Sequence, residues 1–424
     1  MSNRRMTFLF KDNGALRVSV LIGVAAFAVV LGVVLFVFMP TNRVTYDGSV
    51  ISISSSTASS SVVIRPIITH ISTPDPVKAI YMTACTASEP RLRAADVGLV
   101  SASSSEANAI VIDIKDYTGT VSYASTTFQT NRDVRGCRIK YLPEFIAELH
   151  EKGVYVIGRV TVFQDPYYAS HHIDVAIKNK KNPDMAWTDP HGLAYIDAGA
   201  KPFWEYIVGI AKEGYGIGFD EINFDYVRYP SDGALSDALY TWDGTSTKPM
   251  IIRDFFSYLH DELSPLGIPI SADLFGQTTT DKGDMGIGQV LENALPYFDY
   301  IDPMVYPSHY IPGFLNYQKP AEHPYQVVAY SMKTAVERTI AASSSPAKLR
   351  PWLQAFDLGA IYTPAMVRVQ IAASEDAGLS GWLLWNAGSR YQAAFLDPLT
   401  PFTRPIVRSA STSSTTARSV STSR

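Results

Sequence analysis

Eight short apolar runs alternate with helical patterns between residues 77 and 399 of this 424-residue chain. The runs are 77–84, 109–115, 154–163, 217–226, 268–275, 300–306, 351–356 and 381–385. Helical periodicity falls between most of them, in 142–152, 251–263, 287–297, 325–341 and 365–377. Eight strands with intervening helices predict a (β/α)8 TIM barrel. A doubly wound open sheet is the alternative, but its glycine-rich early loop is missing, because residues 83–86 contain no glycine.

Polar residues gather where the apolar runs end. They are Asp113, Lys115, Asp116, Arg159, Gln164, Asp165, Asp225, Arg228, Asp273, Asp302, Tyr306, Gln354, Asp357 and Asn386. The carboxyl ends of all strands of such a barrel meet at one face, and that face carries the active site in barrel enzymes. These side chains are therefore predicted to meet at one site.

The run 218–230 places three carboxylates and an arginine among strand-forming residues. Charges are costly in a core unless they are paired or used, so this strand is predicted to line a site. Strand alternation puts Glu221, Asn223 and Asp225 on one face, which is expected to be the barrel lumen. Asp220 then faces the helices, where a structural role at the start of the strand is expected.

Asp225 is the predicted reactive carboxylate because it lies nearest to the carboxyl end of its strand. Glu221 lies deeper and is predicted to support the site. The alternative is that the carboxylates of this strand only neutralise Arg228 and Lys115, since ion-pair networks also collect carboxylates.

Glycoside hydrolysis needs two carboxyl groups across such a mouth, one to protonate the leaving oxygen and one to attack the sugar or activate water. Asp273, on the adjacent strand, is the predicted partner of Asp225, and Asp302 is the second choice. Each has a structural alternative. Asp273 is otherwise a hydrogen-bonded barrel residue, and Asp302 is otherwise a turn cap before Pro303.

The predicted substrate-binding residues lie at or near the strand ends, and strand alternation places Asp113 on the same face as Lys115. They are Asp113, Lys115, Arg228, Asp302, Tyr306, Glu221 and Trp385. Arg228 is expected either to bind a sugar hydroxyl or to keep Asp225 ionised, and Lys115 to do the same from the second strand. Trp385 is a candidate sugar platform, although tryptophans also fill cores.

Other chemistries find little support. The net charge of −4 gives no basic face of the kind that nucleic-acid-binding proteins show. The sequence lacks the His-Glu-x-x-His and Cys-x-x-Cys patterns of zinc sites and the Gly-x-Ser-x-Gly nucleophile elbow. Residues 283–288 hold three glycines but neither the lysine nor the spacing of a phosphate loop. We therefore expect no metal and no cofactor.

Residues 18–39 form an uncharged apolar run that is long enough to span a bilayer as a helix. Arg4, Arg5, Lys11 and Arg17 precede it and only Arg43 follows closely, so the positive-inside rule places the N-terminus in the cytoplasm. A cleaved signal peptide is the alternative, but the run is long and no small-x-small site follows it.

These features divide the chain into a cytoplasmic N-terminus (1–17), a transmembrane anchor (18–39), a Ser/Thr-rich linker (40–76), the barrel (77–399) and a disordered Ser/Thr/Arg tail (400–424). The two cysteines, Cys85 and Cys137, fall in the part that is expected to be exported. A disulfide and two buried thiols are both compatible with that location.

Four motifs resemble those of a bacterial family of glycosyl hydrolase domains related to α-amylase-like barrels. They are residues 218–230, 112–119, 271–276 and 302–310. The resemblance covers about residues 77–397 and implies a barrel that acts on carbohydrate. The fourth-strand aspartate of α-amylase-like enzymes is the nucleophile, which implies that role for Asp225. Their acid is a fifth-strand glutamate, where this chain has Asp273, and Asn223 stands where they carry an arginine.

The sequence thus predicts a membrane-anchored glycoside hydrolase that acts outside the cytoplasm on a polysaccharide or cell-envelope glycan. Its predicted partners are a carbohydrate substrate and, through the N-terminal helix, the membrane, with no nucleic acid. One alternative is a catalytically silent barrel that binds glycan at the cell surface. Another is a structural envelope protein whose barrel is only a spacer.

Overall fold

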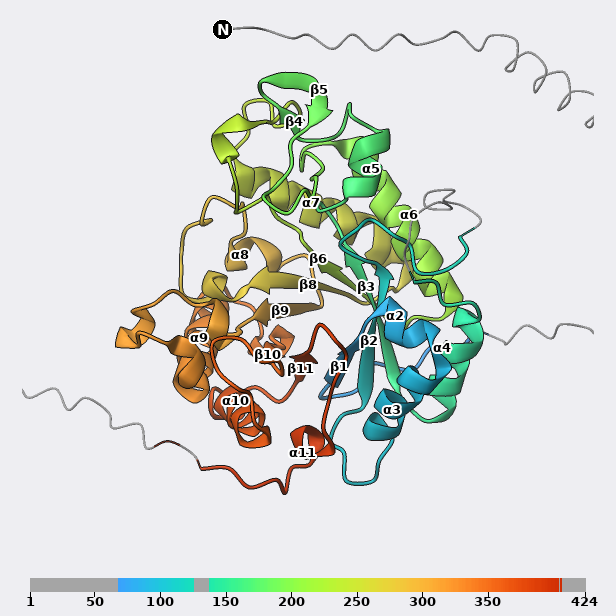
Figure 1. Cartoon of the computed structure of the whole chain (residues 1–424), viewed down its shortest axis with the longest axis vertical. Coiled ribbons are helices and arrows are strands. Elements are labelled where there is room, and N and C mark those ends of the chain that lie inside the picture. Colours follow the sequence, from blue (N-terminus) through green and yellow to red (C-terminus); the bar gives the residue numbers. More distant parts are fainter. Residues whose placement is uncertain (1–67, 126–136, 404, 406–424) are drawn as a thin grey trace, which may run out of the picture. The chain divides into compact units, whose positions relative to one another are not determined.

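The computed structural model describes residues 68–125, 137–403 and 405, and eight parallel strands form a closed barrel there (Figure 1). The order around the barrel is β1-β11-β10-β9-β8-β6-β3-β2. The strands are β1 (Lys78–Met82), β2 (Ala109–Lys115), β3 (Tyr155–Thr161), β6 (Glu221–Asp225), β8 (Ile270–Phe275), β9 (Tyr300–Met304), β10 (Trp352–Gln354) and β11 (Trp382–Trp385). Each of the eight predicted runs contains one of these strands, so the predicted barrel is confirmed.

Helices cover the outside of the barrel and connect successive strands (Figure 1). They are α2 (Ala84–Ser88), α3 (Pro90–Val100), α4 (Leu142–Glu151), α6 (Lys201–Ile217), α7 (Lys248–Leu263), α8 (Leu291–Ala294), α9 (Pro324–Ala341), α10 (Pro364–Asp376) and α11 (Ala393–Leu396). Most of the longer ones carry a proline in the first two positions, where the missing N–H has no helical partner to lose.

The buried core has two layers separated by the strands. Inside the barrel, one apolar cluster contains Val77, Ala79, Tyr81, Ala109, Val111, Tyr155, Ile157, Tyr306, Trp352 and Leu383. Alternate residues of the same strands, such as Ile222 and Phe224 of β6, belong to the larger cluster beneath the helices. Their neighbours Glu221, Asn223 and Asp225 face the lumen, as strand alternation predicted.

Two long connections at the carboxyl ends of β3 and β6 build a small lobe beside the barrel. The first carries α5 (Pro166–His171), β4 (Lys178–Asn179) and β5 (Asn182–Ala186), and the second carries β7 (Ala238–Leu239). These strands pair in an antiparallel sheet of order β5-β4-β7, seen at the top of Figure 1. The lobe therefore joins the loops that follow two neighbouring strands of the site.

The predicted helix at 287–297 is mostly wrong, because only Leu291–Ala294 is helical. The preceding loop turns through Met285, Gly286 and Gly288, each with a positive φ of 51 to 82°. That conformation favours glycine and is incompatible with a right-handed helix, so the glycine-rich stretch 283–288 forms a loop at the barrel mouth.

The segment before β1 packs against the start of the barrel. The Ile71 N–H donates to Asp220 Oδ1 at 2.7 Å, and the Val156 N–H donates to Asp220 Oδ2 at 2.8 Å. His150 Nε2 lies 2.9 Å from the second oxygen. Asp220 therefore ties together the entry segment, β3 and α4, which confirms its predicted structural role at the strand start.

The predicted anchor at 18–39 and most of the predicted linker and tail lie outside the described residues. Within residues 68–125 and 137–403, no helix is both long and apolar enough to cross a membrane.

Cys85 and Cys137 form a disulfide with a Cα–Cα distance of 4.8 Å. Cys85 lies in α2, directly after β1, and Cys137 lies near the end of the connection from β2 to α4. The bond therefore fixes that connection to the carboxyl end of the first strand.

Replacing both cysteines, as Cys85→Ser/Cys137→Ser, is expected to lower the melting temperature. The bond closes a loop of 52 residues, and the chain-entropy model assigns at most about 4 kcal/mol to such a closure. Thermal unfolding followed by circular dichroism measures the loss. A reductant should destabilise the parent protein and leave the double variant unchanged; equal melting temperatures for the parent and the variant would contradict this expectation.

Candidate active site

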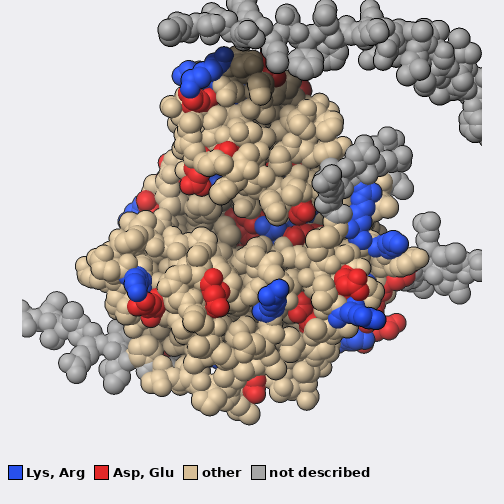
Figure 2. All heavy atoms as spheres, viewed as in Figure 1, with Lys and Arg blue, Asp and Glu red and all other residues tan. Residues whose placement is uncertain are grey.

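Charged side chains meet in a hollow on the barrel. Figure 2 shows acidic and basic atoms inside this hollow, over the region where Figure 1 places β3, β6 and β8, with uncharged residues around them. Asp113, Arg159, Asp225 and Asp273 come from β2, β3, β6 and β8, and each is at most 4 % exposed. The structure therefore brings Asp225 and Asp273, the two predicted catalytic residues, into one buried cluster.

Arg159 is the centre of this cluster. Its Nη1 donates to Asp113 Oδ1 at 2.7 Å, and its Nη2 and Nε donate to Asp225 Oδ2 at 2.5 and 3.2 Å. The other oxygen of Asp113 accepts the hydroxyl of Tyr81 at 2.5 Å. Charge-assisted bonds of this kind are shorter and stronger than hydrogen bonds between neutral groups. Burial raises the pKa of Asp113, and Arg159 opposes the rise.

The backbone after β6 holds the other oxygen of Asp225. The Tyr226 N–H donates to Asp225 Oδ1 at 2.6 Å, and Tyr226 has a φ of 53°. A bulky residue in this left-handed region is strained and persists only where its surroundings impose it. The strained turn and Arg159 together fix both oxygens of Asp225, so its carboxylate is held in one orientation.

Asp273 has a different environment. Its Oδ1 accepts from Asn223 Nδ2 at 2.9 Å and from Trp352 Nε1 at 2.7 Å. Burial first, and then the charges of Asp225 and Asp302, raise the pKa of Asp273 well above its usual range, although Arg159 and Asn223 oppose the rise. These effects favour the protonated form of Asp273 compared with a carboxyl group in water.

The two predicted catalytic carboxyl groups are close enough to act on one sugar. Arg159 Nε lies 3.2 Å from Asp225 Oδ2 and 3.9 Å from Asp273 Oδ2, so these oxygens are at most about 7 Å apart. Paired carboxyl groups in glycosidases stand about 5–9.5 Å apart, depending on the stereochemical course. Asp225 is bound to a guanidinium, whereas Asp273 is the member of the pair whose pKa is raised.

A second guanidinium organises the lower part of the lumen. Arg350, which precedes β10, donates to both oxygens of Glu221 at 2.6 and 3.1 Å and to both oxygens of Asp302 at 3.0 and 3.1 Å. Ser271 and Tyr155 also donate to Glu221, which is fully buried. The structure thus places Glu221 and Asp302 beneath the mouth, in an ion network with Arg350.

A β-bulge in β2 changes the side of the barrel toward which the following side chains point. Asp113 pairs with Arg159, but Lys115 pairs with Val160, so Ile114 is an extra residue in β2. Because a bulge interrupts the strict alternation of side chains, Lys115 leaves the lumen side on which Asp113 lies. The expectation that these two residues share one face is therefore wrong.

The contacts of Lys115 lie on the helix side of the barrel. Its ammonium is 2.8 Å from Asp165 Oδ2, donates to Thr161 O at 2.6 Å, and lies 5.8 Å from the ring centre of Phe203 in α6. The side chain is fully buried. Lys115 therefore pins the loop after β3 to β2.

Arg228 is also turned away from Asp225. Its Nη1 donates to Tyr229 O at 3.0 Å, and the guanidinium stacks 4.4 Å from the ring of Phe275 and 5.0 Å from that of Tyr226. The cation that holds Asp225 is Arg159, so Arg228 instead braces the loops after β6 and β8.

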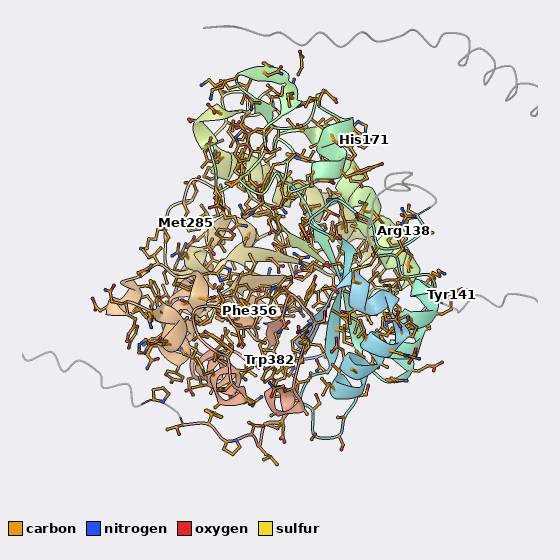
Figure 3. All side chains as sticks on the ribbon, viewed as in Figure 1. Arg138, Tyr141, His171, Met285, Phe356 and Trp382 are labelled. Atoms are coloured by element: carbon orange, nitrogen blue, oxygen red, sulfur yellow. A yellow bond between two sulfur atoms is a disulfide. The ribbon has the colours of Figure 1, made fainter. Side chains whose placement is uncertain are left out.

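Aromatic rings line the mouth. Trp385 stacks on Tyr81 at a centroid distance of 3.9 Å and meets Trp352 edge-on at 5.5 Å. Tyr306 meets Phe356 edge-on at 5.6 Å, and Figure 3 shows Phe356 near the centre of the view. Trp385 is partly exposed, as a sugar platform requires, whereas Tyr306 is buried, and burial raises its pKa well above the usual range.

No group of three or more His, Cys, Asp or Glu side chains in the described ranges is arranged to hold a metal ion. In the mouth, Arg159 and Arg350 occupy the positions between carboxylates that a cation would otherwise take.

Sequence reasoning did not assign roles to several residues that hold this site. They are Tyr81, Arg159, Asn223 and Arg350. Arg159 was visible as a polar residue near a strand end, and Asn223 shares the parity of Asp225. Arg350 lies before its strand, where no pattern distinguishes a lumen residue from a loop residue.

The fold and the mouth define a (β/α)8 barrel with paired carboxyl groups at the carboxyl ends of its strands. Residues 79–391 match the family model described as "Putative glycosyl hydrolase domain". This match covers more than half of the chain, which therefore belongs to that family. No curated protein matches the sequence.

Solved structures show related folds. The chain is 32% identical to a hypothetical protein from Ruminiclostridium thermocellum ATCC 27405, over 46% of this chain and 96% of that one, with a TM-score of 0.41. The glycoside hydrolase domain of PgaB (BpsB) from Bordetella bronchiseptica is 14% identical, over 74% and 95%, with a TM-score of 0.51. Alpha-L-fucosidase isoenzyme 2 from Paenibacillus thiaminolyticus is 12% identical, over 77% and 48%, with a TM-score of 0.52. The last two show a shared fold.

Replacing Arg350 with methionine is expected to cost about 3–5 kcal/mol of unfolding free energy, because Glu221 and Asp302 would lose the buried guanidinium between them. Urea unfolding measures this loss. The control is Lys319→Met, which removes one partner of an exposed ion pair with Glu322 and should change little. An Arg350→Met protein as stable as the parent would contradict the assignment of this network.

Proposed function

We propose that this protein is a glycoside hydrolase in which Asp225 acts as nucleophile or base and Asp273 as acid. The observation that carries the proposal is the contrast between these two carboxyl groups on adjacent strands. Asp225 is bound to Arg159, whereas burial and two neighbouring carboxylates raise the pKa of Asp273, and the Oδ2 atoms of the two residues are at most about 7 Å apart. Membership of a glycosyl hydrolase family supports the same chemistry.

The acid proton belongs on Oδ2 of Asp273. Oδ1 already accepts two N–H bonds, from Asn223 and Trp352, and a protonated oxygen accepts such bonds poorly. Oδ2 is the oxygen on the side of Arg159 and Asp225. A glycosidic oxygen bound there receives this proton while the Asp225 carboxylate attacks the anomeric carbon or activates a water molecule.

The substrate in this proposal is a polysaccharide or a cell-envelope glycan. Trp385, partly exposed and stacked on Tyr81, offers a ring face to a sugar at the rim of the mouth. Arg159 lies 5.0 Å from the Trp385 ring and, with Asp113, shapes the wall of this subsite while both remain bonded within the protein. Lys115, Arg228 and Glu221 are committed to protein contacts, so the proposal leaves them out of the sugar subsites.

We further propose that residues 18–39 anchor the protein in the cytoplasmic membrane, with the barrel outside. The uncharged run and the charges that flank it support the anchor and its orientation. The disulfide between Cys85 and Cys137 supports the exterior location, because such bonds persist in oxidising compartments.

A barrel that binds glycan without cleaving it is the second candidate. The observation that favours it is the burial of Asp273, which is only 1 % exposed. In that case the parent protein would retain a glycan without releasing sugar, and the loss of either carboxyl group would leave retention unchanged.

Asp225→Asn and Asp273→Asn are each expected to reduce sugar release from a panel of polysaccharides and peptidoglycan by at least about 100-fold, since each removes one half of the acid and base chemistry. Reducing ends released by the purified proteins provide the measurement. Aryl glycosides with good leaving groups should restore the rate of cleavage by Asp273→Asn more than that by Asp225→Asn, because such groups depart without a proton. Asp184→Asn, an exposed position in β5, is the matched control. Undiminished release by either variant would contradict the assignment.

Deleting residues 1–39 is expected to move the protein from the membrane fraction to the soluble fraction of a bacterial host, because no other apolar run of that length remains. Immunoblotting of the two fractions checks this expectation. The full chain should also be accessible to external protease in spheroplasts, and protection there would contradict the proposed orientation.

A further inference from the structure

Asp302 lies beside the mouth but is closed off from it. It is 1 % exposed. Its Oδ1 accepts from Arg350 Nε at 3.0 Å, and its Oδ2 accepts from Arg350 Nη2 at 3.1 Å and from Asn223 Nδ2 at 3.2 Å. A sugar hydroxyl would have to displace these donors to reach it. The sequence suggested a substrate contact for Asp302, but these bonds point to another role.

Asn223 connects Asp302 to the proposed acid. The same Nδ2 atom lies 3.2 Å from Asp302 Oδ2 and 2.9 Å from Asp273 Oδ1, so the two oxygens are at most about 6 Å apart. The two strands also pair at this level, with Asp273 opposite Asp302. A carboxylate at that distance, away from bulk water, disfavours a second negative charge on its neighbour.

Arg350 does not neutralise both of the carboxylates that it holds. It is shared between Asp302 and the fully buried Glu221, so two carboxyl groups face one guanidinium. When both are ionised, this network keeps a negative charge, and Asp302 is the member that shares the Asn223 amide with Asp273. The negative charge of the Arg350, Glu221 and Asp302 network thereby disfavours a negative charge on Asp273.

We propose that Asp302 is a positioning residue that acts through Asn223 to orient Asp273 and keep it protonated, rather than a residue that contacts the substrate. The inference rests on the proposed role of Asp273 as the acid. In this proposal the network of Arg350, Glu221 and Asp302 helps to set which of Asp225 and Asp273 carries the proton.

The electrostatics of the surrounding groups agree with this geometry. The titratable groups that face Asp273 are Asp225 from β6, Arg159 from β3, Asp302 from β9 and Tyr306 from the loop after β9. Burial raises the pKa of Asp302 to about 6 despite the opposing effect of Arg350. Asp302 is therefore charged above that pH, and there its charge opposes ionisation of Asp273.

The test is Asp302→Asn, which removes the charge and keeps the shape. Because the negative charge of Asp302 raises the pKa of Asp273, its removal lowers that pKa, and Asp273 should lose its proton at a lower pH than in the parent. Below pH 6 the parent and the variant should behave alike, since Asp302 is then protonated in the parent.

The readout does not require a substrate. The infrared C=O stretching band of a protonated carboxylic acid, assigned to Asp273 by its absence in Asp273→Asn, is followed against pH in the purified full-length protein. In Asp302→Asn the band should disappear at lower pH than in the parent. Asp299→Asn is the matched control, because Asp299 precedes the same strand, is exposed, and bonds to the Ile270 N–H. An unchanged titration of the band, or one shifted to higher pH, overturns the proposal.

Trp352→Phe gives an independent test with the opposite sign. It removes a donor to Asp273 Oδ1, which stabilises the charged form, so the band should persist to higher pH. An unchanged band would contradict the assigned hydrogen bond from Trp352 to Asp273 Oδ1. Should Asp302→Asn not fold, Asp302→Ser, which also removes the charge, replaces it in the same titration, and an unchanged titration there overturns the proposal.

Once a cleaved glycan is known, kinetics add a second readout. The alkaline limb of kcat/KM should move to lower pH in Asp302→Asn while KM stays near the parental value, whereas a substrate contact would raise KM and leave the limb in place. Absence of any cleavage by the parent would refute the proposed function but would leave the infrared result standing.

Discussion

The guanidinium of Arg159 is the group on which the barrel mouth depends. It binds Asp113 and Asp225 and lies 3.9 Å from Asp273, so it holds side chains from three other strands around one buried positive charge. Without it, three carboxyl groups would face one another where water cannot screen them. The same contacts that make this cluster tolerable also hold the carboxylate of Asp225 in a single orientation, which is what a preorganised nucleophile or base requires.

In the part of the lumen that the structure describes, two guanidinium groups lie among five carboxyl groups, those of Asp113, Glu221, Asp225, Asp273 and Asp302. Arg159 donates hydrogen bonds to Asp113 and Asp225, and Arg350 donates to Glu221 and Asp302. Asp273 accepts hydrogen bonds from the Asn223 amide and the Trp352 indole, and Arg159 Nε lies farther away, at 3.9 Å from its Oδ2. Burial and the charges of Asp225 and Asp302 therefore raise the pKa of Asp273 well above its usual range, although Arg159 opposes the rise. The different environments of Asp225 and Asp273 thus follow from how Arg159 and Arg350 are distributed among the five carboxyl groups.

Much of this arrangement was predictable because it follows from local periodicity. The eight runs, the parity of Glu221 and Asp225, and the structural role of Asp220 depend only on alternation along single strands. The failures have non-local causes. Lys115 lies outside the lumen because one bulge reverses the side-chain alternation of β2. The cation bound to Asp225 is Arg159 of the neighbouring strand and not Arg228, as the sequence suggested. The helix expected at 287–297 gave way to a glycine-rich loop.

The sequence by itself determined the number and kind of strands and the carboxyl groups that reach their ends, because side-chain alternation and apolar spacing are properties of short segments. Only the tertiary structure decided which cation meets which carboxylate, that Cys85 reaches Cys137, that Asp302 is sealed beneath the mouth, and that the pKa of Asp273 is raised. Those outcomes depend on distances between strands and loops far apart in the chain, and electrostatic energies in a buried lumen change steeply with such distances.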